Sequence, residues 1–590
     1  EIMPSLVGSE MCIRDRLLAG LVPVLAWSCS DDKLQGGENT PPSTASQNYM
    51  EVSIKMPIAT RTASPSTETE DGQDYENSVK EVLVVVVNVK DKEQQEDTYY
   101  VKEEGEICFV KSVGITSSQD KTTEGVHGND KSYIARINNV TLDTNSDKYY
   151  AVYAFVNPTS EIYNYYNGKL TQTGWKDQSE MATTETATEF ITKYADKDKE
   201  RFFMTDTNVG TGNYSGPDRK QAVHFVAEEG NYKLAATAKV ERAVARFDYK
   251  AAKNKNEYEI KDRNADATKL TVTLEGYKLM NVSKSFYHLK RVAAKKEGDS
   301  TDPDETKITY GGAETVNNYV VDCDWNSTNG KKTWLSKITE DGKESSEALA
   351  IRKGLFFTPL ANSEIDKEEN NEPYLPLDFK EPENTANPAY YIMGYCTENT
   401  VPSVASQQNG LSTAVVFKAK VSGDFINEAT TAALYEYNGS FYNHWDSFKK
   451  AWNISGNTPL TAANEPTTGE ELKTLRETLN GKAKRIPIQG MDEDKYGNVY
   501  YIYWNRHNDN GQNTNMGIME FAVVRNNIYK LSVSKISELG HPNDPTNPTD
   551  PQEPDPDPVN PPKPDEQNKA YMEVDVQILD WTVRVNDIEF

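Results

Sequence analysis

Histidine and cysteine are scarce in this chain, and neither occurs at the spacing of a metal site or a redox-active cysteine pair. Six histidines are spread over 590 residues with no two at the spacing of metal ligands, and none of the five cysteines forms a C-x-x-C pair. The sequence also lacks H-E-x-x-H, G-x-S-x-G and glycine-rich phosphate-binding motifs. It therefore indicates no catalytic residue, no metal ligand and no cofactor, and we expect a protein that is not an enzyme.

Basic charge is in short supply as well. The chain has 64 Lys and Arg against 91 Asp and Glu, which gives a formal net charge of −27. A nucleic-acid-binding face needs clustered Lys and Arg, so we expect no nucleic-acid partner. An acidic surface is typical of a protein that stays soluble in a crowded extracellular space.

The apolar run near the start, Leu17 to Trp27, is too short to span a bilayer. It ends in Ala-Trp-Ser-Cys and resembles a bacterial lipoprotein signal over residues 17–29, in which Cys29 would be acylated. A buried N-terminal helix is the alternative. Residues 1–16 lack an initial Met and look like translated sequencing adapter, so we assign them no function. Residues 30–48 predict a flexible tether.

Tyrosine is plentiful, and short alternating apolar segments recur along the chain. With 33 Tyr and many Val and Thr, the composition predicts a mainly β protein of two or three domains. We place a first sandwich domain at residues 62–252 and a second at 253–540, because the chain turns polar and lysine-rich around the boundary. Residues 498–536 predict three successive antiparallel strands.

One strand pattern occurs at both ends of the chain: "YMEVSIKMPIATRT" starts at Tyr49 and "YMEVDVQILDWTVRV" at Tyr571. The first copy places apolar residues on one face of a strand, at Met50, Val52, Ile54, Met56 and Ile58. The second changes phase after three residues, with apolar side chains at Val574, Val576 and Ile578 and then at Leu579, Trp581, Val583 and Val585. Such a phase slip predicts two short strands joined by a bulge or crossing.

The second copy follows a Pro/Asp-rich segment, residues 541–570, which predicts an extended tether. An apolar strand on a tether is an aggregation hazard unless it is covered. It can fold back onto its own domain or complete a neighbouring molecule.

An aromatic stripe at helical spacing is formed by Phe441, Trp445, Phe448 and Trp452. It could be a platform for a sugar, but core packing is the commoner use of such a stripe. We therefore expect these side chains to be buried.

Several segments together resemble a known family. The lipoprotein leader, "ATRTA" after the first strand, "VERAVARFDY", "YYIMGYCTENTV", "NIYKLSVSKISELGHP" and "VDVQILDW" occur in an order similar to that of Bacteroidales fimbrillins. The resemblance is to the structural subunit of the minor (Mfa-type) fimbria, a type V pilus. It covers most of the chain from Cys29 to Phe590.

The resemblance implies two transthyretin-like antiparallel β-sandwich domains with short helical insertions and a C-terminal donor strand. A lipoprotein precursor would reach the cell surface through a transient lipid anchor in the outer membrane. An arginine-specific surface protease would then cut between Arg61 and Thr62 and remove the first strand, residues 49–61. The groove would accept residues 571–590 of another copy.

The implied partners are thus copies of this chain, accessory and anchor subunits, and the protease, in a surface fimbria that supports adhesion or biofilm formation. Two alternatives stay open. The chain could be an accessory or tip adhesin of the same pilus, or a monomeric surface lipoprotein that binds glycan.

Overall fold

The computed structural model describes the chain between residues 48 and 582. The stretches outside the description in that span are residues 57–68, 130–131, 178, 208–218, 252–255, 266–267, 299–302, 312–317, 363–371, 378–389, 402, 428–429, 468, 490–495, 513, 548–558 and 568–571. The mainly β fold predicted from the sequence is confirmed, and short helices interrupt the strands. Residues 46–590 form one compact unit.

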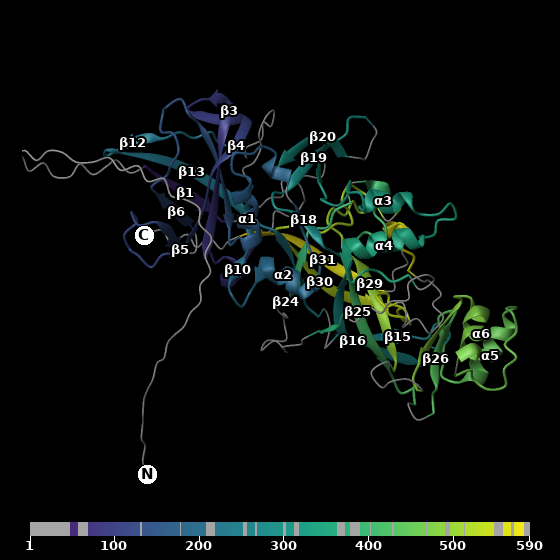
Figure 1. Cartoon of the computed structure of the whole chain (residues 1–590). Helices are drawn as coiled ribbons and strands as arrows, with labels where there is room; N and C mark the ends of the chain where they lie inside the picture. The colour runs from purple at the N-terminus through teal and green to yellow at the C-terminus, as the bar shows by residue number, and fades with distance from the viewer. Residues whose placement is uncertain are drawn as a thin grey trace, which may run out of the picture. The chain divides into compact units, whose positions relative to one another are not determined.

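The first large sheet is built from the N-terminal part of the chain (Figure 1). Its strand order is β4-β3-β7-β11-β13-β1-β6-β5, with β12 paired to β13. The bounds are β1 Asn48–Lys55, β3 Glu81–Gln95, β4 Thr98–Gly114, β5 Gly125–Asn129, β6 Ser132–Asn138, β7 Tyr150–Val156, β11 Met204–Asp206, β12 Val226–Glu228 and β13 Asn231–Arg242. The apolar run from Val82 to Val87 in β3 is entirely buried, as a strand covered on both faces requires.

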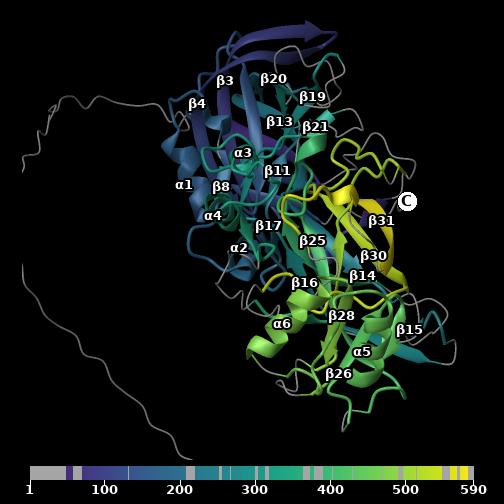
Figure 2. The ribbon, with the colours of Figure 1, turned by 90° about the vertical axis from the view of Figure 1, so that its right-hand side faces the viewer.

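Two further sheets, built mainly from the C-terminal part of the chain, pack face to face and are called here the second sandwich. The first has the order β2-β31-β30-β14-β24, and the second has the order β15-β16-β25-β29, with β23 paired to β16. The bounds are β2 Thr69–Asp71, β14 Val244–Tyr249, β15 Glu257–Lys261, β16 Lys269–Met280, β23 Leu375–Pro376, β24 Tyr391–Thr397, β25 Ala414–Ser422, β29 Asn498–Trp504, β30 Asn527–Ile536 and β31 Met572–Thr582. Tyr249 and Phe417 bring one ring from each sheet to a centroid distance of 5.7 Å, and Figure 2 shows the two layers.

Small sheets and helices fill the connections. The helices are α1 Ser160–Gly168, α2 Ala187–Tyr194, α3 Lys331–Ser336, α4 Ser346–Leu355, α5 Trp445–Ile454 and α6 Gly469–Leu479. The remaining strands are β8 Ser179–Met181, β9 Ala195–Asp196, β10 Arg201–Phe202, β17 Val282–Ser283, β18 Ser285–Tyr287, β19 Arg291–Lys295, β20 Pro303–Tyr310, β21 Asn318–Val320, β22 Phe356–Phe357, β26 Ala433–Tyr437, β27 Ser440–Tyr442 and β28 Ala483–Pro487. The helix N-termini are capped where the sequence offers a hydroxyl, as at Thr159, Thr186 and Ser345.

Two expectations about the chain's organisation are wrong. β14 precedes the predicted boundary at residue 252, yet it pairs with β24 and β30 in the second sandwich. The polar, lysine-rich stretch after β14 is thus a loop inside the second sandwich. The three strands expected over residues 498–536 are only two, β29 and β30, and they lie in different sheets. Between β29 and β30 the chain is held by hydrogen bonds of buried polar side chains. The Asn505 side chain, for example, donates to the Ala522 carbonyl at 2.7 Å.

The Pro/Asp-rich segment is not a free tether in its described parts, residues 541–547 and 559–567. The Tyr500 and His541 backbones exchange two hydrogen bonds, and the Gly410 amide donates to the Pro561 carbonyl at 2.8 Å. Proline cannot donate from its backbone, but its carbonyl still accepts. Both stretches are therefore docked on the second sandwich.

Asp565 makes this docking sensitive to pH. Its carboxyl is buried, which raises its pKa to about 7, although the Asn409 amide donates to it at 2.6 Å. Of the nearby charged groups, Arg506 favours the carboxylate and Glu566 opposes it. Since the folded pKa lies above the unfolded value, the stabilisation is complete below pH 4 and is lost as the pH rises through 7.

We predict that docking of residues 559–567 weakens between pH 5 and 7, by up to about 1.4 kcal/mol per pH unit. Asp565→Asn stays neutral and should remove this dependence. Hydrogen exchange of the Asn409 and Gly410 amides, corrected for intrinsic rates, measures it. An equal pH dependence in the variant would contradict this assignment.

Candidate functional site

Strand β1 lies inside the first sheet, with a neighbour on each side. It runs parallel to β13, where Met50 pairs with Leu234, and antiparallel to β6, where Met50 pairs with Ile137. An interior strand satisfies the backbone groups of both neighbours. Its removal would leave two open strand edges facing one gap, called here the β1 groove.

The inward face of β1 is fully covered. Met50, Val52 and Ile54 are 0% exposed and Met56 is 4% exposed. Beside Val52 and Ile54 the neighbouring strands present small or flat side chains, among them Ala238 on β13 and Ala135 on β6, whereas Met50 lies between two larger aliphatic side chains. The β1 groove is therefore apolar at its floor and shaped for side chains on alternate residues. The predicted Ile58 lies outside the described residues.

The outward face of β1 is polar and charged. Glu51 accepts from Arg136 on β6 at 2.6 Å and from Lys233 on β13 at 2.7 Å. The Tyr49 ring lies 3.9 Å from the Arg136 guanidinium carbon, and its hydroxyl donates to Glu228. The hydrogen bond to Glu51 is the main cause that raises the pKa of Lys233. The alternation of apolar residues does not predict these contacts.

Strand β31 lies beside β30 in the second sandwich, with the short strand β2 on its other side (Figure 2). It runs antiparallel to β30, where Val574 pairs with Val533, and parallel to β2, where Asp580 pairs with Thr69. Like β1, it thus has one parallel and one antiparallel neighbour. Pairing with β30 continues through Ile578 and Leu579 with no shift in register, so the two separate strands predicted at that point form one strand.

β31 is covered less completely than β1. Met572 is 8% exposed, whereas Val574 and Val576 are only half-buried. The side chains of Ile578, Leu579 and Trp581, and all of Val583 and Val585, lie outside the described residues.

The segment that follows the predicted cleavage site is anchored to the second sandwich. Glu70 in β2 accepts from Arg246 on β14 at 2.6 Å, and buried Glu76 accepts from the same guanidinium at 2.9 Å. Arg242 donates to the Glu76 carbonyl at 3.3 Å. The chain from residue 69 onward is thus held independently of β1. Cys29, Arg61 and Thr62 themselves lie outside the described residues.

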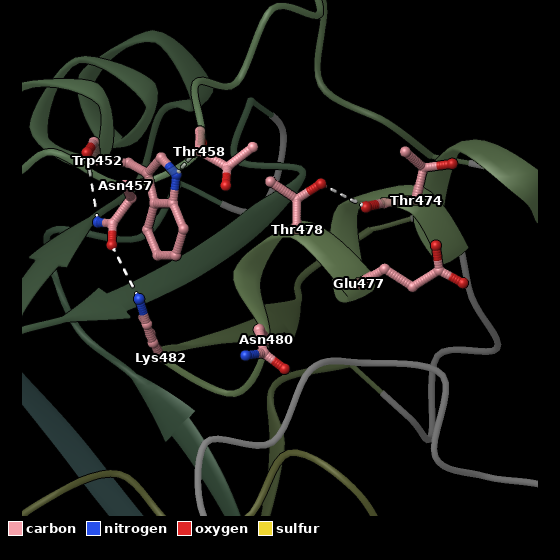
Figure 3. Close-up of a pocket in the computed structure, with 8 residues that line it drawn as sticks. All are labelled: Trp452, Asn457, Thr458, Thr474, Glu477, Thr478, Asn480 and Lys482. Atoms are coloured by element: carbon pink, nitrogen blue, oxygen red, sulfur yellow. Dashed lines mark hydrogen bonds between the residues drawn. The ribbon is translucent and has the colours of Figure 1, made fainter.

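The aromatic stripe is buried, as expected from its spacing. Phe448 and Trp452 are 0% exposed, and Phe448 stacks on Tyr435 at a centroid distance of 4.2 Å. A polar cavity of about 350 Å³ lies beside Trp452 (Figure 3). The Trp452 indole donates to the Thr458 carbonyl, and Asn457 accepts from Lys482. Trp452 is the aromatic residue of the lining, and because it is fully buried the cavity presents no open aromatic face. This arrangement offers no platform for stacking a sugar.

The described residues also bear on metal binding, membrane crossing and the state of the cysteines. No group of three or more His, Cys, Asp or Glu side chains there is arranged to hold a metal ion. None of the helices found there combines the length and apolar character needed to cross a membrane. Cys108, Cys323 and Cys396 are free thiols.

One family of known proteins matches the C-terminal part of the chain. Residues 494–587, which contain β29, β30 and β31, match the family model described as major fimbrial subunit protein type IV, fimbrillin, C-terminal. None of the curated proteins compared with the chain matches it.

Three solved structures from Bacteroides and Parabacteroides species align with the chain at low identity. A candidate cell adhesion protein from Bacteroides eggerthii is 11% identical over 93% of this chain and 99% of its own, with a TM-score of 0.32. A fimbrial assembly protein from Parabacteroides distasonis is 10% identical over 47% of this chain and 86% of its own, with a TM-score of 0.21. A fimbrial protein from Bacteroides ovatus is 10% identical over 46% of this chain and 42% of its own, with a TM-score of 0.14.

The family model covers the last strands of the second sandwich, β31 included, and agrees with the family predicted from the sequence. The Mfa-type assignment stays a prediction. Residues 494–587 are thus similar to the C-terminal region of fimbrillins, which are major fimbrial subunit proteins, and this similarity supports a structural role in a fimbria.

Proposed function

We propose that this subunit polymerises by strand exchange, in which β1 is removed and β31 of another copy enters the β1 groove. One observation carries the proposal. Both copies of the repeat have the Tyr-Met-Glu-Val sequence and the same alternation, yet the apolar side chains of β1 are fully buried, while Val574 and Val576 of β31 are only half-buried in their own sandwich. The β1 groove would cover the same side chains better than their present site does.

The free energy of exchange favours the groove on two counts. Full burial of a valine side chain is worth roughly 1.5–3 kcal/mol, and transfer would gain the unrealised part of that for Val574 and Val576. The backbone gains as well, because β2 is only three residues long, whereas β6 pairs with β1 from Tyr49 to Lys55. The cost of ordering β31 largely cancels in this difference, since β31 is a strand in both sites.

Proteolysis after Arg61 would start the exchange. The site lies between Met56, the last described residue after β1, and Thr69, the first residue of β2. Because Glu70 and Glu76 hold the downstream segment on Arg246, a cut there would free β1 and leave the rest of the fold in place. An arginine-specific surface protease fits this requirement.

The tail must also reach the next subunit. Residues 541–570 could extend to at most about 90 Å in a polyproline-like conformation. Docking of residues 559–567 on the second sandwich shortens that reach. Release of this stretch is therefore part of the proposed transfer.

Export as a lipoprotein completes the proposal and is supported by the apolar leader that ends at Cys29. Labelled palmitate should enter the precursor but not its Cys29→Ala variant. Equal labelling of both proteins would show that Cys29 is not acylated, and would leave the proposed strand exchange unaffected.

We predict that Arg61→Ala blocks maturation and yields folded, exported monomers that retain β1, because the groove is never opened. Thr62→Ala, which keeps the arginine, is the control and should be cut normally. N-terminal sequencing and SDS-resistant ladders of surface protein measure the outcome. Wild-type polymers that still carry residues 49–61 would rule out exchange.

We also predict that deletion of residues 571–590 leaves the first large sheet and the second sandwich folded but abolishes polymerisation. In their own sandwich most of the described apolar residues of β31 are only half-buried, so their loss removes a small part of the core. Thermal unfolding should therefore stay cooperative, with a lower midpoint temperature. Added to mature intact subunits, the deleted protein should cap chains and shorten ladders, because it accepts a strand and donates none.

Loss of cooperative unfolding in the deletion variant would make β31 a permanent strand of its own sandwich. Monomeric mature protein would then favour the glycan-binding lipoprotein. A protein that caps chains even with its tail intact would favour the accessory or tip adhesin.

A further inference from the structure

The apolar floor of the β1 groove accounts for Met and Val in the repeated Tyr-Met-Glu-Val sequence. It does not account for Tyr and Glu, which belong to the opposite face of the strand. In β1 these two residues, Tyr49 and Glu51, make the most specific contacts of the outward face. Their recurrence at Tyr571 and Glu573 therefore calls for a physical reason.

Glu51 bridges the two strands that flank β1. Its carboxylate lies 2.6 Å from Arg136 on β6 and 2.7 Å from Lys233 on β13. The three side chains are 23%, 13% and 27% exposed, respectively, so these ion pairs are better shielded than those of a fully solvated surface. One acidic residue thus ties both walls of the groove to the strand inside it.

Loss of β1 would leave two cations on the outer rim of the empty groove. Arg136 would keep the Asn138 side chain at 3.1 Å, and Lys233 would keep Glu228 at 3.7 Å, but neither would keep its closest carboxylate. The open groove therefore combines an apolar floor with a positive rim. A strand that carries one outward carboxylate at the right position fits both.

We propose that Arg136 and Lys233 form a clamp that recognises Glu573 on the tail of a second copy of this chain and so sets its register. The inference rests on the strand exchange proposed above. Aligning the two copies of the repeat puts Glu573 at the position of Glu51, with Met572, Val574 and Val576 at the positions of Met50, Val52 and Ile54. The incoming strand then runs parallel to β13 and antiparallel to β6, as β1 does.

The clamp together with Glu228 beside it discriminates between registers that the apolar pattern cannot tell apart. A slip of one residue turns the apolar side chains outward and is excluded by the floor of the groove. A slip of two keeps them inward, with Val576 at the position of Val52 and Asp575 at the clamp. It also places Glu573 at the position of Tyr49, where Glu228 would repel it. Only the unshifted register puts an acid at the clamp and a tyrosine beside Glu228.

The experiment uses full-length precursors that are matured by cleavage and then polymerised. Glu573→Lys should slow polymerisation by at least about tenfold, since it brings a third cation to the clamp. Asp575→Lys is the matched control: the same charge change on the same face, two residues further on, at the position of Ser53. Its rate should stay within about twofold of wild type.

A reversed clamp, Arg136→Glu with Lys233→Glu, should restore polymerisation with Glu573→Lys tails and reject wild-type tails. The precursor of that variant also carries Glu51→Lys, which keeps β1 compatible with the reversed clamp and disappears on cleavage. In its own subunit, the register partner of Glu573 on β30 is Lys535. Glu573→Lys would put two lysines at these paired positions and so weaken the pairing of β31 with β30. Slow polymerisation of this variant therefore cannot result from tighter binding of β31 within its own sandwich.

Rescue by the reversed clamp, together with an unaffected Asp575→Lys control, establishes the recognition. Equal effects of the two tail variants, or no rescue while wild-type subunits still polymerise, overturn the clamp and leave strand exchange standing. If wild-type subunits with intact tails do not polymerise after cleavage, strand exchange itself fails.

Discussion

An interior strand cannot leave a β-sheet without a substitute. β1 pairs along its whole length with β13 and β6 and covers the apolar floor beneath it. Its loss exposes two rows of backbone donors and acceptors together with the apolar residues it had covered, and both are costly in water. A subunit that lost this strand would need another in its place, and in the proposed exchange this constraint links maturation to assembly.

The same constraint bears on how the free chain avoids aggregation through open strand edges before assembly. β1 fills the groove, and β31 is paired with β30 and β2, so neither the acceptor nor the tail is left as an open edge. Each of the two strands has one parallel and one antiparallel neighbour, which is the match that the proposed exchange requires. The anchors of Glu70 and Glu76 on Arg246 keep a cut after Arg61 from disturbing the second sandwich.

The strand itself could be predicted from the sequence, whereas its surroundings could not. The alternation of Met50, Val52 and Ile54 is a local property with a period of two, and local patterns can be read directly. Arg136 and Lys233 come from distant strands, so only the pairing of β6 and β13 with β1 reveals their meeting at Glu51. For the same reason the polar stretch after Tyr249 was indistinguishable from a domain boundary, although β14 before it already belongs to the second sandwich. The docking of the Pro/Asp-rich segment depends on partners such as Asn409, which no composition could identify.

The most direct test is a side-chain-resolution structure of the assembled fimbria. The account predicts that residues 49–61 are absent and that Met572, Val574 and Val576 of a neighbouring subunit lie between β13 and β6, on the floor that β1 covers in the free chain. Fimbriae in which β1 still fills that groove, with β31 paired to β30 of its own subunit, would contradict it.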